Sequence, residues 1–304
     1  MPGEPDETEL IERGAREGPP VIPALAGYTG HLLRGAYVAA LDHARERLPA
    51  DGQPRVYGIL ALLASRGPRS QQQLGELLGV NRTIMVKIVD AMEASGLLER
   101  RRNPADRRSY ALEPTQEGLA TLARLGPAVL EAEASFTAPL KKAGRARLNA
   151  LLRQLLAGFG HEAPTPLADR TGYLIAAAHR QVRERFEAAL APIGIEARQF
   201  GALATIDAEA PCTQQVVARR LGVTGPVVVQ LVDELERAGL VKRERNPADR
   251  RSYALRPTAK GKTALRRTRA AIDAMAATIA QPLGPEGDEE LRALLRKLLR
   301  LDDS

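Results

Sequence analysis

The sequence predicts a mainly α-helical protein built from two tandem copies of one domain, each copy carrying a small β-hairpin. The eleven residues from Arg102 to Leu112 recur unchanged from Arg245 to Leu255, 143 residues later. Leucine, alanine and valine recur at helical spacing, whereas aromatic residues make up only 3% of the chain. The length of 304 residues suits two domains of the commonest size. Together these observations indicate a duplicated helical domain rather than a solenoid, whose repeats are far shorter.

The repeat sets the expected domain boundaries. Residues 1–23 are rich in proline, glycine and acidic side chains, and we expect them to form a flexible tail. The first copy covers residues 24–160 and the second covers residues 166–303. Residues 161–165 between them form a short linker, because glycine and proline at its ends cannot continue a helix.

Each copy predicts the same helices in the same order. The long first helices are Leu25–Leu48 and Leu167–Leu190, the second helices are Tyr57–Ser65 and Phe200–Asp207, the short third helices are Gln71–Leu78 and Gln214–Leu221, and the fourth helices run from Asn81 to Ser95 and from Thr224 to Ala238. Ser70 and Thr213 precede the short helices as N-cap residues, and Leu-Gly-Val ends each of them.

A hairpin and two more helices complete each copy. In the first copy, strands Leu97–Arg102 and Arg107–Leu112 flank the turn sequence Asn-Pro-Ala-Asp, and Pro114-Thr115 then starts a long helix. The last helices carry leucine stripes, from Leu148 to Leu156 and from Leu291 to Leu299. Stripes this apolar need a surface to pack against.

A short helix, a glycine turn, a second helix and a basic hairpin form the winged helix-turn-helix arrangement, in which the second helix enters the major groove of DNA. The net charge of +7 permits such a partner. The run Arg100–Arg102 leads into the hairpin, whose arginines suit a narrow minor groove. The candidate contacts to double-stranded DNA are Ser70, Asn81, Arg82, Thr83, Lys87, Arg107 and Arg108 in the first copy and Thr213, Thr224, Gln230, Arg250 and Arg251 in the second.

The two recognition helices differ although the hairpins are identical. The second copy has glycine and proline at the start of the helix, and Gln230 replaces Lys87, so it loses both cations of the first. Proline is tolerated in the first turn, so the helix can still form, and Val227 offers methyl contacts. We therefore expect unequal DNA half-sites about one helical turn apart. Asn81 and Thr224 have an alternative role as helix caps rather than base readers.

In these motifs the chain resembles the MarR (multiple antibiotic resistance regulator) family of transcription factors. The resemblance is strongest over Leu78–Gly118 and Leu221–Gly261, where Leu-Gly-Val, Val-Asp, Gly-Leu, Asn-Pro-x-Asp-x-Arg and Pro-Thr-x-x-Gly occur in that order. It implies a dimer fused into one chain: tandem winged helix-turn-helix domains that share a helical dimerisation-like lobe. The chain would then act as a monomeric, intramolecular pseudo-dimer and as a ligand-responsive repressor.

The resemblance also implies roles for individual residues. Asp90 would pair with Arg108, and Asp233 with Arg251, to hold each hairpin; the alternative is that these arginines are solvated. A small-molecule effector of unknown identity would bind between the lobe and the winged helices, whereas core packing is the alternative for the aromatic candidates. The candidate effector residues are Tyr28, His31, Arg34, Tyr57, Tyr173, Arg180 and Phe200.

Other classes of function find little support in the sequence. The single cysteine, Cys212, excludes an intramolecular disulfide and fits a cytoplasmic, nucleoid-associated protein, although a thiol redox sensor is an alternative. The four histidines lack metal-ligand spacing, and no P-loop, dinucleotide fingerprint or nucleophile elbow occurs, so we expect no metal, cofactor or enzymatic activity. No apolar run is long enough to span a membrane. A protein-interaction scaffold that has lost DNA binding is the remaining alternative.

Overall fold

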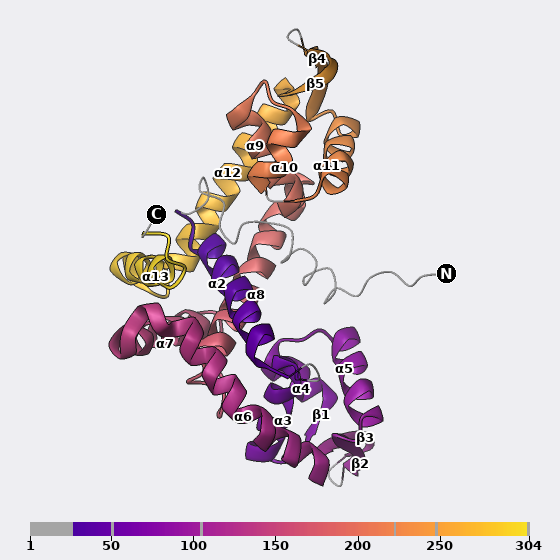
Figure 1. Cartoon of the computed structure of the whole chain (residues 1–304), viewed down its shortest axis with the longest axis vertical. Coiled ribbons are helices and arrows are strands. Elements are labelled where there is room, and N and C mark those ends of the chain that lie inside the picture. The colour runs from indigo at the N-terminus through magenta and orange to yellow at the C-terminus, as the bar shows by residue number, and fades with distance from the viewer. Residues whose placement is uncertain (1–26, 50–51, 104–105, 222, 247–248, 303–304) are drawn as a thin grey trace. The chain divides into compact units, whose positions relative to one another are not determined.

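The computed structural model describes residues 27–49, 52–103, 106–221, 223–246 and 249–302, without the side chains of 103–109 and 246–252. The expected tail, residues 1–23, lies outside the described residues. The first repeat contains α2 (Thr29–Arg47), α3 (Pro54–Arg66), β1 (Arg69–Ser70), α4 (Gln71–Leu78), α5 (Arg82–Ala94), β2 (Leu98–Asn103), β3 (Asp106–Pro114), α6 (Gln116–Thr137), η2 (Ala138–Leu140) and α7 (Lys141–Gly158). The second contains α8 (Thr171–Leu190), η3 (Ala191–Ile193), α9 (Ala197–Glu209), α10 (Gln214–Leu221), α11 (Gly225–Arg237), β4 (Val241–Asn246), β5 (Asp249–Pro257), α12 (Ala259–Ala280) and α13 (Gly284–Leu298) (Figure 1).

The predicted fold class is confirmed: both repeats are mainly helical, and each carries a β-hairpin. Several expected helix boundaries were wrong: α3 and α9 begin at Pro54 and Ala197, three residues before the expected Tyr57 and Phe200. Helix α8 begins at Thr171 and not at Leu167, because the residues before it form turns instead. The Leu167 amide donates to the Pro164 carbonyl at 2.7 Å, and the Arg170 amide donates to the Leu167 carbonyl at 3.0 Å.

The two hairpins are antiparallel, and a short segment adds to each. In the first repeat β1 pairs with β3, giving the strand order β1-β3-β2. In the second repeat β4 pairs with β5, and Cys212 forms an isolated bridge with Leu255 at the position corresponding to β1. The sequence did not predict β1, because two residues are too few to show alternation.

The core of the first winged helix comes from every element around it. Apolar residues of α3 pack against α4, α5 and the hairpin. The members that are buried are Ile59, Leu60, Ala61, Leu62, Leu63, Leu74, Met85, Val89, Met92, Leu98, Leu112 and Leu167. All of these buried residues belong to the first repeat except Leu167, which belongs to the second. Tyr173 of α8 also packs against this core, so the beginning of the second repeat helps to complete the first winged helix.

The same exchange occurs in the second repeat. Its core is built around Phe200, Leu203, Val228 and Leu255, and Tyr28, just before α2, packs against it. The compact units therefore do not follow the halves of the sequence. One unit, called here the first unit, is Leu32–Gln181 with Pro282–Ser304, and the second unit is Met1–His31 with Val182–Gln281. Helices α2 and α8 each contribute to both units.

Within the first unit, the last helices of the two repeats pack together. A Cβ atom placed on Gly144 of α7 would lie 3.7 Å from Cδ2 of Leu294, and one placed on Gly287 of α13 would lie 3.7 Å from Cδ2 of Leu151. Gly287 and Leu294 are the counterparts of Gly144 and Leu151, each 143 residues later. Reciprocal contacts between equivalent residues are the mark of a two-fold interface.

The Pro-Thr-x-x-Gly motif joins the hairpin to the following helix. Thr115 is the N-cap of α6: its Oγ1 accepts a hydrogen bond from the Gly118 amide at 3.0 Å, and its own amide donates to the Leu97 carbonyl at 3.1 Å. A Cβ atom on Gly118 would lie 2.0 Å from that carbonyl oxygen. Gly261 stands in the same relation to Leu240 in the second repeat. The glycine is therefore required by the close approach of the helix to the preceding backbone.

Candidate nucleic-acid interface

Helices α4 and α5 form a helix-turn-helix whose ends are defined by side-chain caps. Ser70 and Gln73 form a capping box: the Gln73 amide donates to Ser70 Oγ at 3.2 Å, and the Ser70 amide donates to Gln73 Oε1 at 2.9 Å. Gly79 ends α4 with φ 58°, a left-handed conformation that glycine adopts without steric cost. Asn81 Oδ1 accepts a hydrogen bond from the Ile84 amide at 2.8 Å and starts α5. Ser70 and Asn81 thus serve as caps in this structure.

The first recognition helix presents its cations to the exterior. Arg82, Thr83 and Lys87 are exposed, while Met85 and Val89 on the opposite face are buried in the core. Arg82 and Lys87 make no hydrogen bond or ion pair with any described residue. The side of α5 that a winged helix turns toward DNA therefore carries two uncommitted positive charges.

The sequence reasoning missed an apolar residue on the same face. Val86, one helical turn after Arg82, is 37% exposed, and its counterpart Val229 is 44% exposed. Val227, expected to offer methyl contacts, is instead half-buried against the core of the second repeat. Exposed valine methyl groups can contact the methyl group of thymine. Val86 could have been predicted to lie on the exposed face, because residues four apart lie on the same side of a helix and Arg82 was expected to face DNA.

The second recognition helix, α11, lacks these charges. Thr224 occupies its N-cap position without a side-chain cap hydrogen bond, whereas Thr213 Oγ1 at the start of α10 accepts one from the Val216 amide at 3.4 Å. Gly225 is exposed at the position of Arg82. Gln230, at the position of Lys87, donates from Nε2 to Glu234 Oε1 at 3.2 Å. The two winged helices therefore present chemically different helices to a partner.

Each recognition helix is tied to the first strand of its hairpin by an arginine. Arg100 of β2 donates to the carboxylates of Asp90 and Glu93 on α5. The hydrogen bond to Asp90 and the charge of Glu93 raise the pKa of the Arg100 guanidinium above its ordinary value. In the second repeat Arg243 makes the corresponding contacts, with Asp233 Oδ1 at 2.5 Å and with Glu236. Because one arginine and two carboxylates make the same contacts in both repeats, we infer that they hold the first strand of each hairpin against its recognition helix.

The expected ion pairs from Asp90 to Arg108 and from Asp233 to Arg251 involve side chains outside the described residues. The side chains of Arg107 and Arg250 also lie outside them. The pairing with Arg108 and Arg251 stays a prediction, as does their contact with DNA. Arg100, from the arginine run considered for DNA contact, is engaged within the protein.

The candidate effector residues are divided between the two compact units. Arg34 and Tyr57 lie in the first unit together with Tyr173 and Arg180, whereas Tyr28 and His31 lie in the second unit, as does Phe200. This division does not follow the repeats, because the first helices of both repeats contribute to both units. Phe200 is buried and belongs to the core of the second winged helix.

The polar members of these sets have distinct surroundings. Tyr173 Oη donates to the Leu77 carbonyl at 3.0 Å and lies 3.2 Å from His161 Nε2, and burial raises its pKa to about 12. Tyr28 Oη donates to Asp273 Oδ1 at 3.3 Å. Arg34 is half-buried, burial lowers its pKa, and it has no hydrogen-bond or ion-pair partner among the described residues. Arg34 is thus the candidate whose charge is least compensated.

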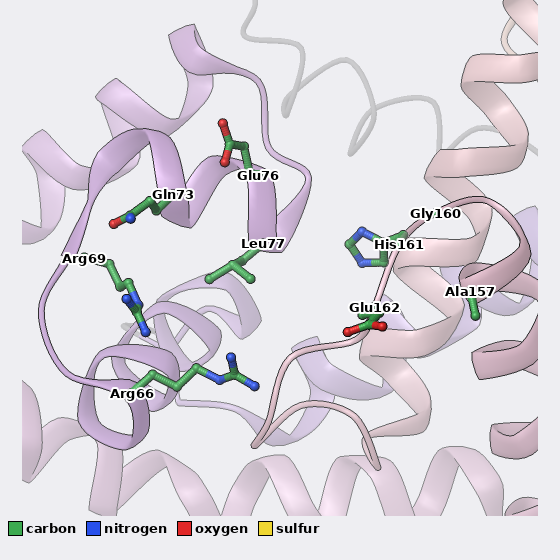
Figure 2. A pocket seen from close by; sticks show the side chains of 9 residues that line it. All are labelled: Arg66, Arg69, Gln73, Glu76, Leu77, Ala157, Gly160, His161 and Glu162. Carbon is green, nitrogen blue, oxygen red and sulfur yellow. The ribbon is translucent and has the colours of Figure 1, made fainter.

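A pocket of about 620 Å³ lies in the first unit, between the helix-turn-helix and the linker, and Tyr173 contacts two of its lining residues, Leu77 and His161 (Figure 2). Its lining residues are Arg66, Arg69, Gln73, Glu76, Leu77, Ala157, Gly160, His161 and Glu162. None of the seven candidate effector residues belongs to this set. Arg66 Nε donates to the Thr165 carbonyl at 2.9 Å, so the linker is fastened to the end of α3.

Cys212 lacks the exposure and the lowered thiol pKa that are typical of reactive cysteines. It is 5% exposed, and burial, together with the charge of Glu209, raises its pKa to about 11. At pH 7 only about one thiol in ten thousand would be ionised, and the thiolate is the reactive form. Cys212 lies inside the core of the second winged helix, which accounts for its burial.

We expect thiol labelling of the folded chain at pH 7 to be slow, because Cys212 is buried and protonated. The rate should rise as the pH is raised toward 11, and it should rise at least about a hundredfold when the chain is unfolded in denaturant. A disulfide-exchange reagent followed by absorbance measures both rates. If mild oxidant released DNA from the native chain but not from Cys212→Ser, the redox-sensor alternative would be correct instead.

Two absences hold for the part of the chain that the structure describes. There, no group of three or more histidine, cysteine or acidic side chains is placed to hold a metal ion. No described helix combines the length and the apolar character needed to cross a membrane.

The paired helices, the basic recognition helix and the hairpin define the class of this protein as a tandem winged helix-turn-helix protein. Models of the MarR family match residues 54–110 and 193–252. A putative transcriptional regulatory protein for the hcr operon of Thauera aromatica is 36% identical over 155 residues, which cover 50% of this chain and 89% of the relative. The chain belongs to the MarR family, in two tandem copies, and is a DNA-binding transcriptional regulator rather than an enzyme.

Other relatives also align with about half of the chain. The HTH-type transcriptional repressor Mb2911 of Mycobacterium bovis is 28% identical over 127 residues, covering 42% of this chain and 91% of the repressor. The solved structure of the transcriptional repressor CouR bound to a 23-mer DNA duplex is 32% identical, with a TM-score of 0.41, and covers 45% of this chain and 96% of that one. These relatives are each about one repeat long.

Proposed function

We propose that this regulator is a ligand-responsive repressor that binds an asymmetric, pseudo-palindromic operator as a single-chain pseudo-dimer. The observation that carries the proposal is that the exposed faces of the two recognition helices differ in charge, although the hairpins beside them have the same sequence. Arg82 and Lys87 face outward in the first repeat, where the second has Gly225 and Gln230. A homodimer must read both half-sites with one helix sequence, whereas a fused chain can read two different ones.

The packing of α13 on α7 supports the single-chain part of the proposal. In this arrangement both repeats contribute to one lobe, as the two subunits of a dimer would. Each winged helix then serves one half-site, and half-site centres about one DNA turn apart allow both recognition helices to enter the same face of the duplex. The arginines of the hairpins, Arg107, Arg108, Arg250 and Arg251, are proposed to contact the flanking backbone or minor groove.

Arg34 supports the proposed ligand response. A half-buried guanidinium without a partner among the described residues is unfavourable, and an anionic group on an effector would compensate it. Tyr57, Tyr173 and Arg180 belong to the same compact unit as Arg34 and are proposed as the other members of that site.

The asymmetry can be tested on the operator itself. Footprinting of the purified chain on genomic DNA would first locate the site. Equivalent base pairs in the two half-sites are then changed one at a time, and the affinity is measured at constant salt. We expect each change in one half-site to cost about 1–3 kcal/mol, as for a directly read base pair, and the mirrored change to cost much less.

Equal losses at mirrored positions would contradict the proposed asymmetry. The salt dependence of affinity tests DNA binding separately, because each phosphate contact releases counterions. Affinity that barely changed with salt would favour a protein-interaction scaffold in place of a DNA-binding regulator.

A further inference from the structure

Two equivalent residues of the repeats touch each other between α7 and α13, which lie side by side in the first unit (Figure 1). Arg147 donates from Nε to Glu290 Oε1 at 2.9 Å and from Nη2 to Oε2 at 2.5 Å. Glu290 is the counterpart of Arg147, as Gly287 is of Gly144, 143 residues later. In a two-fold interface only a residue on the axis contacts its own counterpart. Arg147 and Glu290 therefore mark the local pseudo-two-fold axis.

A second pair of counterparts meets where α2 and α8 come together in the first unit. The rings of Tyr37 and His179 are stacked, with centroids 4.9 Å apart and planes inclined by 17°. The helices α2 and α8 align at an offset of 142, since Thr-Gly-His-Leu from Thr29 matches Thr-Gly-Tyr-Leu from Thr171. Tyr37 and His179 thus occupy equivalent positions, and here too the pair consists of two different residues.

In a homodimer each of these positions would face itself. Arginine would meet arginine, or glutamate would meet glutamate, and like charges at hydrogen-bonding distance repel. The fused chain is free of this restriction, and its axis holds a bidentate ion pair, the strongest geometry for these two groups. Neither self-pairing, of repeat 1 with repeat 1 or of repeat 2 with repeat 2, can place opposite charges on the axis.

We propose that the axis of the lobe has diverged into complementary pairs that specify pairing of repeat 1 with repeat 2, so that the face of each repeat fits the other repeat and not a second copy of itself. The inference rests on the intramolecular pairing proposed above, but it is independent of DNA binding. Arg147 and Glu290 are 52% and 41% exposed, so attraction alone is weak. The discrimination comes from the contrast between opposite charges in the mixed pair and like charges in both self-pairs.

Charge reversal in the full chain tests the pair. Arg147→Glu places two glutamates on the axis and Glu290→Arg places two arginines there, and we expect each to lower Tm by roughly 2–4 °C. The double reversal restores an opposite pair and should recover most of that loss. Glu289→Arg is the matched control: it makes the same charge change at an exposed neighbour that has no partner among the described residues. If the double variant showed the sum of the two losses, or the control matched Glu290→Arg, the pairing would be refuted.

Partner choice is tested by mixing the two single variants. Each has like charges on its own axis, and opposite charges can meet only between the two kinds of chain. Refolding an equimolar mixture should give a species with one chain of each kind, several-fold more abundant by native mass spectrometry than any two-chain species of either variant alone. The excess should shrink in about 1 M salt, which screens exposed charges. Equal amounts of two-chain species in the mixture and in the separate variants would overturn the inference.

Discussion

Replacing Arg82 with alanine is expected to weaken operator binding by about 1–3 kcal/mol, roughly five- to 150-fold in Kd. Arg82 is exposed on the first turn of α5 and has no described partner within the protein, so its guanidinium is available to a base edge. The loss should be largest on the native operator and smaller on operators already altered in the half-site that Arg82 reads. Anisotropy titrations at one fixed salt concentration measure both effects.

The chain offers a matched control for this substitution. Gly225 holds the same helical position in the second repeat, and Gly225→Ala should change Kd by less than about twofold, because it adds no charge or hydrogen-bonding group. Lys87→Gln, which introduces the residue found at Gln230, should weaken binding evenly across sequences and lower the salt slope by about one phosphate contact. An Arg82→Ala chain that kept both its affinity and its base preference would show that α5 does not read DNA.

Gly118→Ala is expected to lower the free energy of unfolding by about 3 kcal/mol, at the upper end for an overpacked site. The added methyl group would lie 2.0 Å from the Leu97 carbonyl oxygen. That oxygen is backbone and accepts a hydrogen bond from the Thr115 amide, so it cannot move aside without loss. The hairpin and α6 would have to separate. Denaturant unfolding followed by circular dichroism measures the change.

Gly201→Ala provides the comparison in another helix. Gly201 lies in the interior of α9, and a Cβ atom placed on it would lie 3.7 Å from Cδ2 of Leu221, an ordinary van der Waals distance. Alanine should therefore raise stability there by up to about 1 kcal/mol through helix propensity. The same chemical change is thus expected to have opposite signs at two helical glycines. Equal effects at the two sites would contradict the close-approach explanation of the Pro-Thr-x-x-Gly motif.

The local elements could be predicted from the sequence because their signals are local. Caps at Ser70 and Asn81 and the apolar spacing of α5 placed both helices of the helix-turn-helix within about a residue of their bounds. The hairpin followed from its Asn-Pro turn sequence. The same apolar spacing predicted that Arg82 and Lys87 are exposed, because the apolar face of α5 packs on the core and the opposite face remains in solvent.

Long-range pairing could not be predicted in this way. Nothing near Leu167 or Tyr173 shows that they complete a core formed about a hundred residues earlier, because the expected domain boundaries came from the repeat alone. Arg100 looked like part of a DNA-binding charge run, because the carboxylates that hold it, Asp90 and Glu93, lie on a different element. Asp90 and Glu93 come within reach of Arg100 only when β2 folds back along α5.

The exchange of core residues between the repeats has a consequence for the order of events during synthesis. A ribosome that has produced only residues up to 160 has made every helix of the first winged helix, but not Leu167 or Tyr173, which cover its core. Helix α13, the partner of α7, emerges later still. The nascent first half therefore exposes this apolar surface until the second half is translated, and transiently exposed apolar surface is prone to aggregation.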